Sequence, residues 1–444
     1  MIRSVVPKLR RLPTVFVRRT HFQVPFEDDL TTVDDDDFGL AGFQLYKESP
    51  DVLRQKELLG LELRSDVASA EPVPATAAAT ASLSETACLR QPIIFSSKLH
   101  DPYLNLAIED YIYNQMPLPT SEDEHNCNRL MLYVNSPCVV IGKNQNPWAE
   151  TNLPLLNALG IPLVRRRSGG GTVVHDLGNV NYSFMTTKQK FDRFNFSRLI
   201  TESITELCSL KVNDRGDIVD GPTGKKVSGS AYKLSKGKSY HHGTMLLSLN
   251  LDVLRRLLRR DEAKVGHVDL KSSVKSVRSP VVNIGIPIDR FIQLVSSGFA
   301  LNYGVTVLPI NELDEMLGLP SFAENACTTF TIDEDTPLPV EVLQTVEELK
   351  QWSWRFGHTP LFTHTFKSAT HGLQVTFHIG KNARLIDFEI ATETTGGATA
   401  SSFDMLRLMI NTHGYVEYKG STIAGFITDD SISEWIGVSI DGTS

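Results

Sequence analysis

The stretch RRRSGGGTVVHDLGNVNYSF, residues 165–184, places three arginines directly before three glycines and a β-like run. Glycine has no Cβ atom, so a ligand can approach the main chain there and meet its N–H groups. Guanidinium groups pair well with phosphate and carboxylate. Glycines alone would more simply predict a flexible turn beside solvated arginines. The combination instead predicts an anion site with the candidate residues Arg165, Arg166, Arg167, Ser168, Gly169, Gly170 and Gly171.

The familiar phosphate loops do not explain this site. The Walker pattern, GxxxxGK followed by Ser or Thr, is absent, and GPTGKK at residues 221–226 has neither its spacing nor its hydroxyl. No GxGxxG follows the preceding strand. Any nucleotide must therefore bind in another way.

Lys226, in KKVSGSAY, is the candidate for chemistry. In a strand, Lys226, Ser228 and Ser230 would project from one face. A lysine beside hydroxyls can hold a carboxylate against a phosphate while a phosphoryl or acyl group transfers. A solvated lysine on an edge strand is the ordinary alternative. Asp217 could orient such a lysine or hold a magnesium ion, although alone it would be a turn residue.

Other kinds of site find little support. His241 and His242 point to opposite faces of a strand, so at most one can join Lys226. These two and His175 have no carboxylate at metal-ligand spacing, which disfavours zinc. No Ser-His-Asp or Cys-His nucleophile arrangement can be argued. The sequence therefore predicts an enzyme that positions two substrates without a covalent step on the protein.

Composition favours a soluble protein of two or three domains. The chain has 444 residues, 41% hydrophobic and 22% charged, with a formal charge of −8 that argues against a general nucleic-acid binder. Its five cysteines form no CxxC pair, which fits a reducing compartment. No run reaches the roughly 18 apolar residues of a membrane span.

The first 90 residues differ from the rest. Residues 1–26 are rich in arginine and contain no acidic residue, which predicts a mitochondrial (matrix) targeting segment; a disordered basic tail is the alternative. Residues 27–90 include an acidic run and the low-complexity EPVPATAAATASLSETA, which predict a disordered linker.

Folded sequence is expected from Gln91 onward. A strand is predicted over 92–97, then a helix with Asp101 as N-cap and Pro102 at its first position. Two further strands are expected around residues 135–137 and a helix near Pro147.

Two hairpins are expected to carry the candidate residues. The first would join 172–175 to 180–185, and the second 226–234 to 239–249. Helical periodicity follows each without a regular βαβ rhythm. We therefore predict an α+β fold, with a large, mostly antiparallel catalytic domain over 91–352 and a small α/β unit over 353–444.

Several motifs together resemble the lipoate–protein ligase A family. They are RRRSGGGTVVHDLGNVNYSF, KKVSGSAY, YHHGTMLL, KSVRSPVVN, DPYLNLAIEDYI, IGKNQNPW and SWRFGHTPLFTH. The similarity runs from about Phe95 to the C-terminus and leaves the first 90 residues uncovered. It implies a catalytic domain of the biotin/lipoate ligase type with a C-terminal accessory domain. It also implies two steps, in which lipoate and ATP give lipoyl-AMP, and the lipoyl group then passes to an acceptor lysine.

The resemblance also assigns residues. Lys226 would be catalytic and lie between the acyl carbonyl and the phosphate, and Asp217, the possible magnesium ligand, would lie beside the adenylate. The residues implied to bind ATP or lipoyl-AMP are Arg166, Ser168, Gly169, Gly170, Gly171, Thr172, Val173, Val174, His175, Asn179, Asp217, Lys226, Ser228 and His242.

The implied partners are lipoate or octanoate, ATP, magnesium, and two kinds of acceptor: the lipoyl domains of 2-oxoacid dehydrogenase E2 subunits and the glycine cleavage H protein. Gly216 and Arg167 depart from the family pattern near the expected nucleotide. They keep open an ATP-independent lipoyltransferase that uses preactivated or protein-bound lipoyl groups. A catalytically silent scaffold and a biotin ligase are weaker alternatives, because Lys226 and the glycines are retained and a GRGR-type loop is absent.

Overall fold

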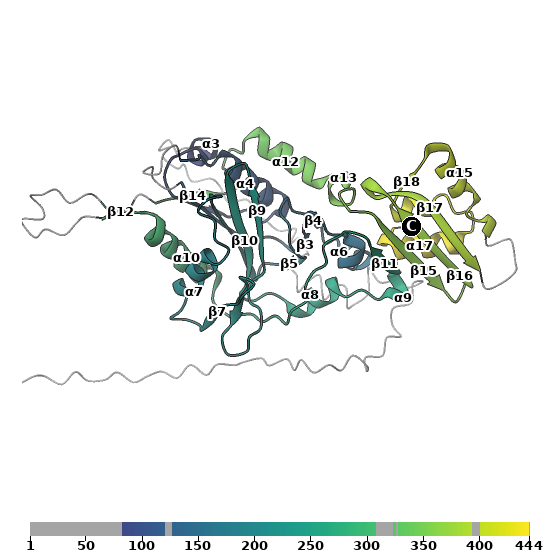
Figure 1. The fold of residues 1–444 in the computed structure, drawn as a ribbon, viewed down its shortest axis with the longest axis horizontal. Helices are drawn as coiled ribbons and strands as arrows, with labels where there is room; N and C mark the ends of the chain where they lie inside the picture. Colours follow the sequence, from purple (N-terminus) through teal and green to yellow (C-terminus); the bar gives the residue numbers. More distant parts are fainter. Residues whose placement is uncertain (1–81, 120–126, 308–322, 326, 393–399, 444) are drawn as a thin grey trace, which may run out of the picture. The chain divides into compact units, whose positions relative to one another are not determined.

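The structure is a computed structural model that describes residues 82–119, 127–307, 323–325, 327–392 and 400–443 (Figure 1). The targeting segment predicted over residues 1–26 lies outside the described residues, as does most of the linker predicted over 27–90. Within the described ranges, no helix is both long enough and apolar enough to cross a membrane.

The last part of the predicted linker is a folded element. Helix α3 (Leu83–Ala87) begins at Ser82, whose side chain and that of Glu85 form a capping box. Leu83 and Ala87 are fully buried in a hydrophobic core. The linker prediction is wrong at this end, because a capped turn with two apolar side chains can bury itself on a neighbouring core.

A six-stranded sheet forms the centre of the predicted catalytic domain. Its order is β14 (Thr328–Ile332), β1 (Ile93–Ser97), β2 (Arg129–Tyr133), β6 (Asn179–Thr187), β10 (Lys238–Leu246), β9 (Ser230–Ser235). β1 runs parallel to β14 and β2, and the other pairs are antiparallel.

A smaller sheet accompanies it, in the order β4 (Leu163–Arg165), β3 (Cys138–Ile141), β5 (Val173–His175). The two strands predicted around residues 135–137 therefore both form, as β2 and β3, but they belong to different sheets.

The first predicted hairpin is wrong. β5 pairs with β3, whereas β6 pairs with β2 and β10. At the turn between them, Asp176 Oδ1 accepts a hydrogen bond from the Gly178 N–H (2.7 Å). A Cβ atom on Gly178 would collide with the backbone of Ser248. The glycine of HDLGN therefore allows the chain to pass closely under a second segment on its way to another sheet.

The second predicted hairpin is confirmed, although its first strand begins at Ser230 and not at Lys226. β9 and β10 pair antiparallel. Lys236 (φ 51°) and Gly237 (φ 74°) form its tight turn, in which both residues have positive φ.

Helices cover both faces of the six-stranded sheet. On one face, alternate side chains of β1 and β2 pack with α4 (Pro102–Gln115) and α12 (Val340–Lys350). On the other, the intervening side chains pack with α7 (Asn195–Ser203) and α10 (Ile288–Tyr303). α4 begins as predicted, with Asp101 Oδ1 accepting from the N–H groups of Tyr103 and Leu104.

A five-stranded antiparallel sheet occupies the C-terminal part, in the order β11 (His267–Leu270), β15 (Phe362–Ser368), β16 (Leu373–Ile379), β17 (Arg384–Thr392), β18 (Val416–Glu417). Its edge strand β11 comes from before the predicted boundary between residues 352 and 353. Trp148 also stacks on Phe362, with ring centroids 5.2 Å apart. The boundary itself stays a prediction, but the C-terminal sheet shares a strand and a core with earlier sequence.

The remaining described elements are α5 (Pro147–Glu150), α6 (Leu153–Leu159), β7 (Leu210–Val212), β8 (Ile218–Asp220), α8 (Leu251–Leu258), α9 (Glu262–Val265), β12 (Val305–Val307), β13 (Ala323–Asn325), α13 (Trp352–Arg355), a 3₁₀ turn (Lys381–Ala383), α15 (Asp404–His413), α16 (Gly420–Ala424) and α17 (Asp430–Asp441). Helices combined with mostly antiparallel sheets confirm the predicted α+β class, although β1 and β2, and likewise β3 and β4, pair in parallel.

Candidate active site

A cavity of about 450 Å³ lies on the α4 face of the six-stranded sheet. One wall consists of side chains of β2, β6 and β10, and another of residues of β3 and β5. Nine of the predicted site residues line it: Arg166, Gly170, Gly171, Thr172, Val173, His175, Asp217, Lys226 and His242. The structure thus brings together residues from the glycine loop, β5, β10 and the two segments that flank β8.

Other predicted residues lie outside the cavity lining. Val174 packs in a hydrophobic core, and Gly169 is exposed. Ser228 is fully buried, with its Oγ 2.8 Å from Tyr182 Oη. Asn179 is also fully buried, and its Nδ2 donates to Asn181 Oδ1 (3.0 Å). Ser168 is buried as well but contacts a lining residue, His242.

The glycine loop requires bare backbone for its own packing. Gly170 has φ +90°, and a Cβ atom there would lie 2.9 Å from Arg166 Nη2. A Cβ on the neighbouring Gly142 would collide with the carbonyl oxygen of Gly170. Side chains at these positions would force the loop out of place, so the glycines shape this wall of the cavity.

All three arginines form hydrogen bonds or ion pairs with other groups of the protein. Arg165 donates to the carbonyl oxygens of Gly142, Lys143, Gln145 and Arg355. Burial lowers the pKa of Arg165 to about 9 and that of Arg166 to about 10, so both stay charged at neutral pH. Arg165 therefore braces the fold, contrary to its predicted place in an anion site.

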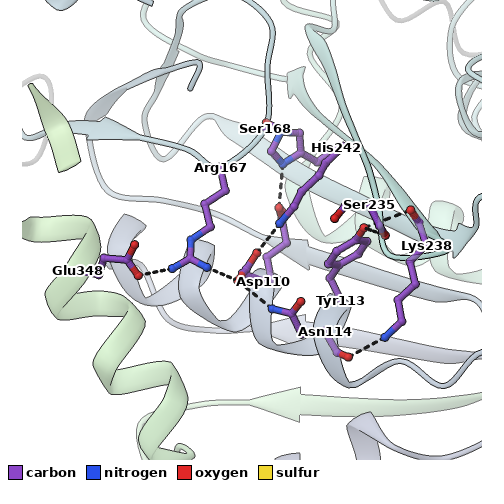
Figure 2. A network of polar contacts seen from close by, with 11 residues as sticks. Asp110, Tyr113, Asn114, Arg167, Ser168, Ser235, Lys238, His242 and Glu348 are labelled. Atoms are coloured by element: carbon purple, nitrogen blue, oxygen red, sulfur yellow. Dashed lines mark hydrogen bonds and ion pairs between the residues drawn. The ribbon is translucent and has the colours of Figure 1, made fainter. Parts of the chain in front are cut away.

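Arg166 and Arg167 have different partners. Arg166 donates to the carbonyl oxygens of Gly169 and Gly171 (2.7 Å each) while it lines the cavity. Arg167 bridges Asp110 of α4 (2.8 Å) and Glu348 of α12 (2.5 Å), as Figure 2 shows. The arginines thus fix the loop and its flanks, and a nucleotide contact by Arg166 stays a prediction.

Lys226 forms an ion pair inside the cavity. Its Nζ lies 2.9 Å from Asp217 Oδ1, and the two side chains are 23% and 11% exposed. Lys226 is not in a regular strand, because it bridges to Val219 and Val281, and β9 begins only at Ser230. The prediction that Lys226, Ser228 and Ser230 share one strand face is therefore wrong. The pairing with Asp217 is what orients the ammonium group.

A buried chain of polar groups links α4 to the loop. His242 Nδ1 lies 2.9 Å from Glu109 Oε1. Its Nε2 lies 2.7 Å from Ser168 Oγ, and Figure 2 labels these two residues. Tyr133 Oη donates to Glu109 Oε2 (3.1 Å), and burial keeps the pKa of Tyr133 well above its usual value. Glu109, from a helix of mostly buried residues, and Tyr133 were both missed by sequence reasoning.

This Ser168–His242–Glu109 order matches a serine-nucleophile triad, which sequence reasoning did not find. Ser168, however, is only 1% exposed and does not line the cavity. Its Oγ also accepts a hydrogen bond from Arg166 Nε (3.0 Å). The chain therefore fixes the His242 ring and the loop, and it leaves the prediction of no covalent step in place.

A segment after β11 supplies residues that the sequence prediction omitted. Ser276 Oγ accepts from the Thr172 N–H and from Gln145 Nε2 (2.9 Å each). Ser276 and Lys275 both line the cavity, as does Arg215. The motif KSVRSPVVN marks this segment in the sequence, but it does not single out Lys275 or Ser276.

The two departures from the family pattern do not enter the cavity. Gly216 has φ +83°, a conformation open to glycine and, less readily, to asparagine, so this position is set by backbone geometry. Arg167 is held by Asp110 and Glu348, outside the cavity lining.

Acid is expected to destabilise the protein below about pH 6.5. Burial lowers the pKa of His175, His241 and His364 to about 3. Between these values and the ordinary histidine pKa, unfolding takes up protons. The contribution of these histidines to the free energy of unfolding is therefore fully present above about pH 6.5 and is lost as pH falls. Three such groups give a slope of up to about 4 kcal/mol per pH unit. Urea unfolding at several pH values measures it.

A single substitution checks that the buried histidines cause this slope. His241→Gln should remove about one third of it. Burial raises the pKa of Asp176 and Asp441, which act in the opposite direction at more acid pH. A stability that stays constant from about pH 7 to about pH 5 would contradict the assignment of neutral buried histidines.

Known proteins are similar in sequence to the part of the chain that forms the cavity. The family model of the lipoyl protein ligase A/B catalytic domain matches residues 101–300. A Schizosaccharomyces pombe protein, provisionally named lipoate-protein ligase A, is 37% identical over 284 residues, which cover 63% of this chain and 75% of that protein. A Saccharomyces cerevisiae protein with the same provisional name is 40% identical over 247 residues, 54% of this chain and 59% of that protein.

Among solved structures, a P. falciparum protein in complex with lipoate is 22% identical, with a TM-score of 0.47, and the match covers 78% of this chain and 98% of that one. The residues matched by the family model include the glycine loop, Lys226 and His242.

Proposed function

The chain belongs to the lipoate–protein ligase A family, and from this premise we propose that it attaches lipoyl or octanoyl groups to a specific lysine of acceptor domains. One observation carries the proposal: the glycine loop and the Lys226–Asp217 pair line the same cavity. In such a cavity the Lys226 ammonium group is fixed opposite the exposed backbone of the glycine loop. An acyl acid, a nucleotide phosphate and an acceptor amine can be held together there.

The proposed reaction has two steps. The carboxylate of lipoate attacks the α-phosphorus of ATP, and pyrophosphate leaves. The amine of the acceptor lysine then attacks the acyl carbonyl carbon of lipoyl-AMP, an amide bond forms, and AMP leaves with the bonding electrons. Lys226 would stabilise negative charge on the oxygens of the phosphate and carbonyl in both steps, with Asp217 orienting it.

The nucleotide phosphates would meet further positive charge. Arg215 and Lys275 line the cavity together with Lys226. Magnesium usually combines one or two carboxylates with substrate phosphates and water. Asp217 fits that donor chemistry as a single ligand, and no group of three or more metal-binding side chains occurs in the described part of the chain. Magnesium would offset phosphate charge when bound.

The cavity favours the complete ligase over the ATP-independent transferase. Gly216 and Arg167 are the two departures that put adenylation in doubt, and neither residue lies in the cavity lining.

We propose E2 lipoyl domains and the glycine cleavage H protein as acceptors, and the mitochondrial matrix as the location. Fractionation of cells expressing the chain with and without residues 1–26 tests the location, and cytosolic accumulation of the full chain would contradict it.

A two-arm assay on the full chain tests the activity. One arm offers an unmodified lipoyl domain with lipoate, ATP and magnesium, and the other offers the same domain with synthetic lipoyl-AMP. Modification in both arms supports the complete ligase. Modification only with lipoyl-AMP would assign the transferase alternative, and modification in neither would favour a catalytically silent scaffold.

A further inference from the structure

Two fully buried asparagines lie behind one wall of the cavity. Asn105 of α4 and Asn135, in the segment after β2, are both 0% exposed. Asn105 Nδ2 donates to the carbonyl oxygen of Leu99 (2.8 Å) and to Asn135 Oδ1 (2.9 Å). Asn135 Nδ2 lies 3.0 Å from His175 Nδ1. The row leads from a backbone carbonyl to a side chain that lines the cavity.

The direction of each hydrogen bond in this row is determined. A backbone carbonyl can only accept, so the Asn105 atom that faces Leu99 must be its amide nitrogen. Ser97 agrees, because its Oγ accepts from the Leu99 N–H and donates to Asn105 Oδ1 (2.7 Å). The same Asn105 nitrogen faces Asn135, so Asn135 presents its oxygen there and its nitrogen to His175.

His175 must therefore accept at Nδ1. A neutral imidazole that accepts at one nitrogen carries its proton on the other, which is Nε2 here. Burial lowers the pKa of His175 to about 3, so the ring stays neutral at physiological pH. His175 lines the cavity, and its buried Nε2 has no hydrogen-bond partner among the described residues. A buried donor without a partner is unfavourable, and an acceptor atom of a ligand would satisfy it.

We propose that Asn105 and Asn135 are positioning residues that hold His175 in its Nε2–H form, and that this N–H donates to an oxygen of the acyl or acyl-phosphate group in the cavity. The ligand half of this inference rests on the proposed function. An oxygen is the expected acceptor because a thioether or disulfide sulfur accepts hydrogen bonds only weakly.

The assignment separates the two histidines of the cavity. His242 has both ring nitrogens engaged by Glu109 and Ser168. His175 has one nitrogen fixed by Asn135 and a donor left over. In this form His175 has no basic lone pair toward the ligand, so it acts as a hydrogen-bond donor and does not take the proton of the acceptor lysine.

Nitrogen NMR of the full chain, labelled with ¹⁵N-histidine, tests the tautomer without reference to activity. Protonated and unprotonated ring nitrogens have distinct shifts, and loss of signals in His175→Phe assigns His175 among the 12 histidines. We expect an unprotonated Nδ1 and a protonated Nε2 throughout about pH 5 to about pH 8. The opposite tautomer, or titration within this range, would overturn the inference.

Asn135→Ala tests the positioning role. We expect a mixture of tautomers, because the donor to Nδ1 is gone. Asn152→Ala is the matched control, since Asn152 caps α6 through Leu155 N–H (3.2 Å) and does not line the cavity. It should lower stability and leave the tautomer unchanged. A pure Nε2–H form in Asn135→Ala would overturn the positioning role, and the wild-type spectrum decides the tautomer even if this variant does not fold.

Lipoate and octanoate test the ligand half, because they share a carboxylate and differ at the distal end. We expect both to shift the Nε2–H signal, and His175→Phe to weaken both by about tenfold, with His175→Gln recovering part of the loss through its amide N–H. Full affinity of His175→Phe, or weakening for lipoate alone, would overturn the oxygen assignment. If wild-type protein bound neither acid, the proposed function would fail with the ligand half, whereas the tautomer result would stand.

Discussion

Replacing Lys226 with alanine is expected to reduce lipoyl transfer by about 10³-fold or more, because charge on the transferring group then develops without its cation. The Lys226 ammonium lies 2.9 Å from Asp217 Oδ1 and lines the cavity beside the glycine loop. Without it, the Asp217 carboxylate would face the negatively charged phosphates directly. Both the formation of lipoyl-AMP and its consumption should therefore fall, and each is measured separately by pyrophosphate release and by acceptor modification.

The neighbouring lysine gives a matched control. Lys225→Ala removes the same charge one residue earlier, outside the cavity lining, and should retain most of the activity. Lys226→Ala should unfold thermally only slightly below wild type, because a partly exposed lysine contributes little core packing. A loss of stability typical of a core deletion, or equal activity losses in the two variants, would mean that Lys226 is a structural residue.

The sequence predicted features that depend on neighbouring residues. The start of α4 followed from Asp101 and Pro102, and the Asp101 side chain does cap the helix. The β9–β10 hairpin followed from a turn containing Lys236 and Gly237, and both have positive φ. Such features are determined within a few residues, so periodicity and turn chemistry suffice to predict them.

Pairing between distant segments was not predictable in the same way. β5 and β6 are adjacent in sequence and alternate like a hairpin, yet β5 pairs with β3. The contact between His242 and Glu109 spans 133 residues, and that between His242 and Ser168 spans 74. Nothing local to Glu109 marks it as a partner of His242, because a carboxylate on a helix is ordinarily solvated.

The role of the arginines shows a further limit. The sequence places three equal charges beside the glycines, and composition cannot tell which charge faces a ligand and which faces protein carbonyls. Arg165 and Arg166 are both buried, at 0% and 5% exposure, whereas Arg167 is partly exposed between two carboxylates. Burial assigns the first two to the backbone of the loop and of its surroundings, since a buried cation must be hydrogen-bonded.

Replacing Arg166 with alanine is expected to lower lipoyl-AMP formation by about 10²-fold and the free energy of unfolding by about 3 kcal/mol. Arg166 donates to the carbonyl oxygens of Gly169 and Gly171 and to Ser168 Oγ. Without these bonds, the loop loses the geometry that its glycines allow, and its carbonyl groups lose their partner. Pyrophosphate release with lipoate and ATP measures the first effect, and urea unfolding measures the second.

Arg167→Ala is the matched control for this variant. It removes an adjacent arginine whose ion pairs are partly exposed, and Asp110 keeps a partner in Lys233 (2.8 Å). We expect Arg167→Ala to lower the free energy of unfolding by about 1 kcal/mol or less, because exposed ion pairs contribute little. The KM for the acceptor domain should change less than lipoyl-AMP formation in Arg166→Ala, because we propose that the loop faces the nucleotide and not the acceptor. Equal losses in lipoyl-AMP formation and in transfer to the acceptor would instead place Arg166 at the acceptor. Equal losses of activity in Arg166→Ala and Arg167→Ala would mean that Arg166 supplies only its charge and does not brace the loop.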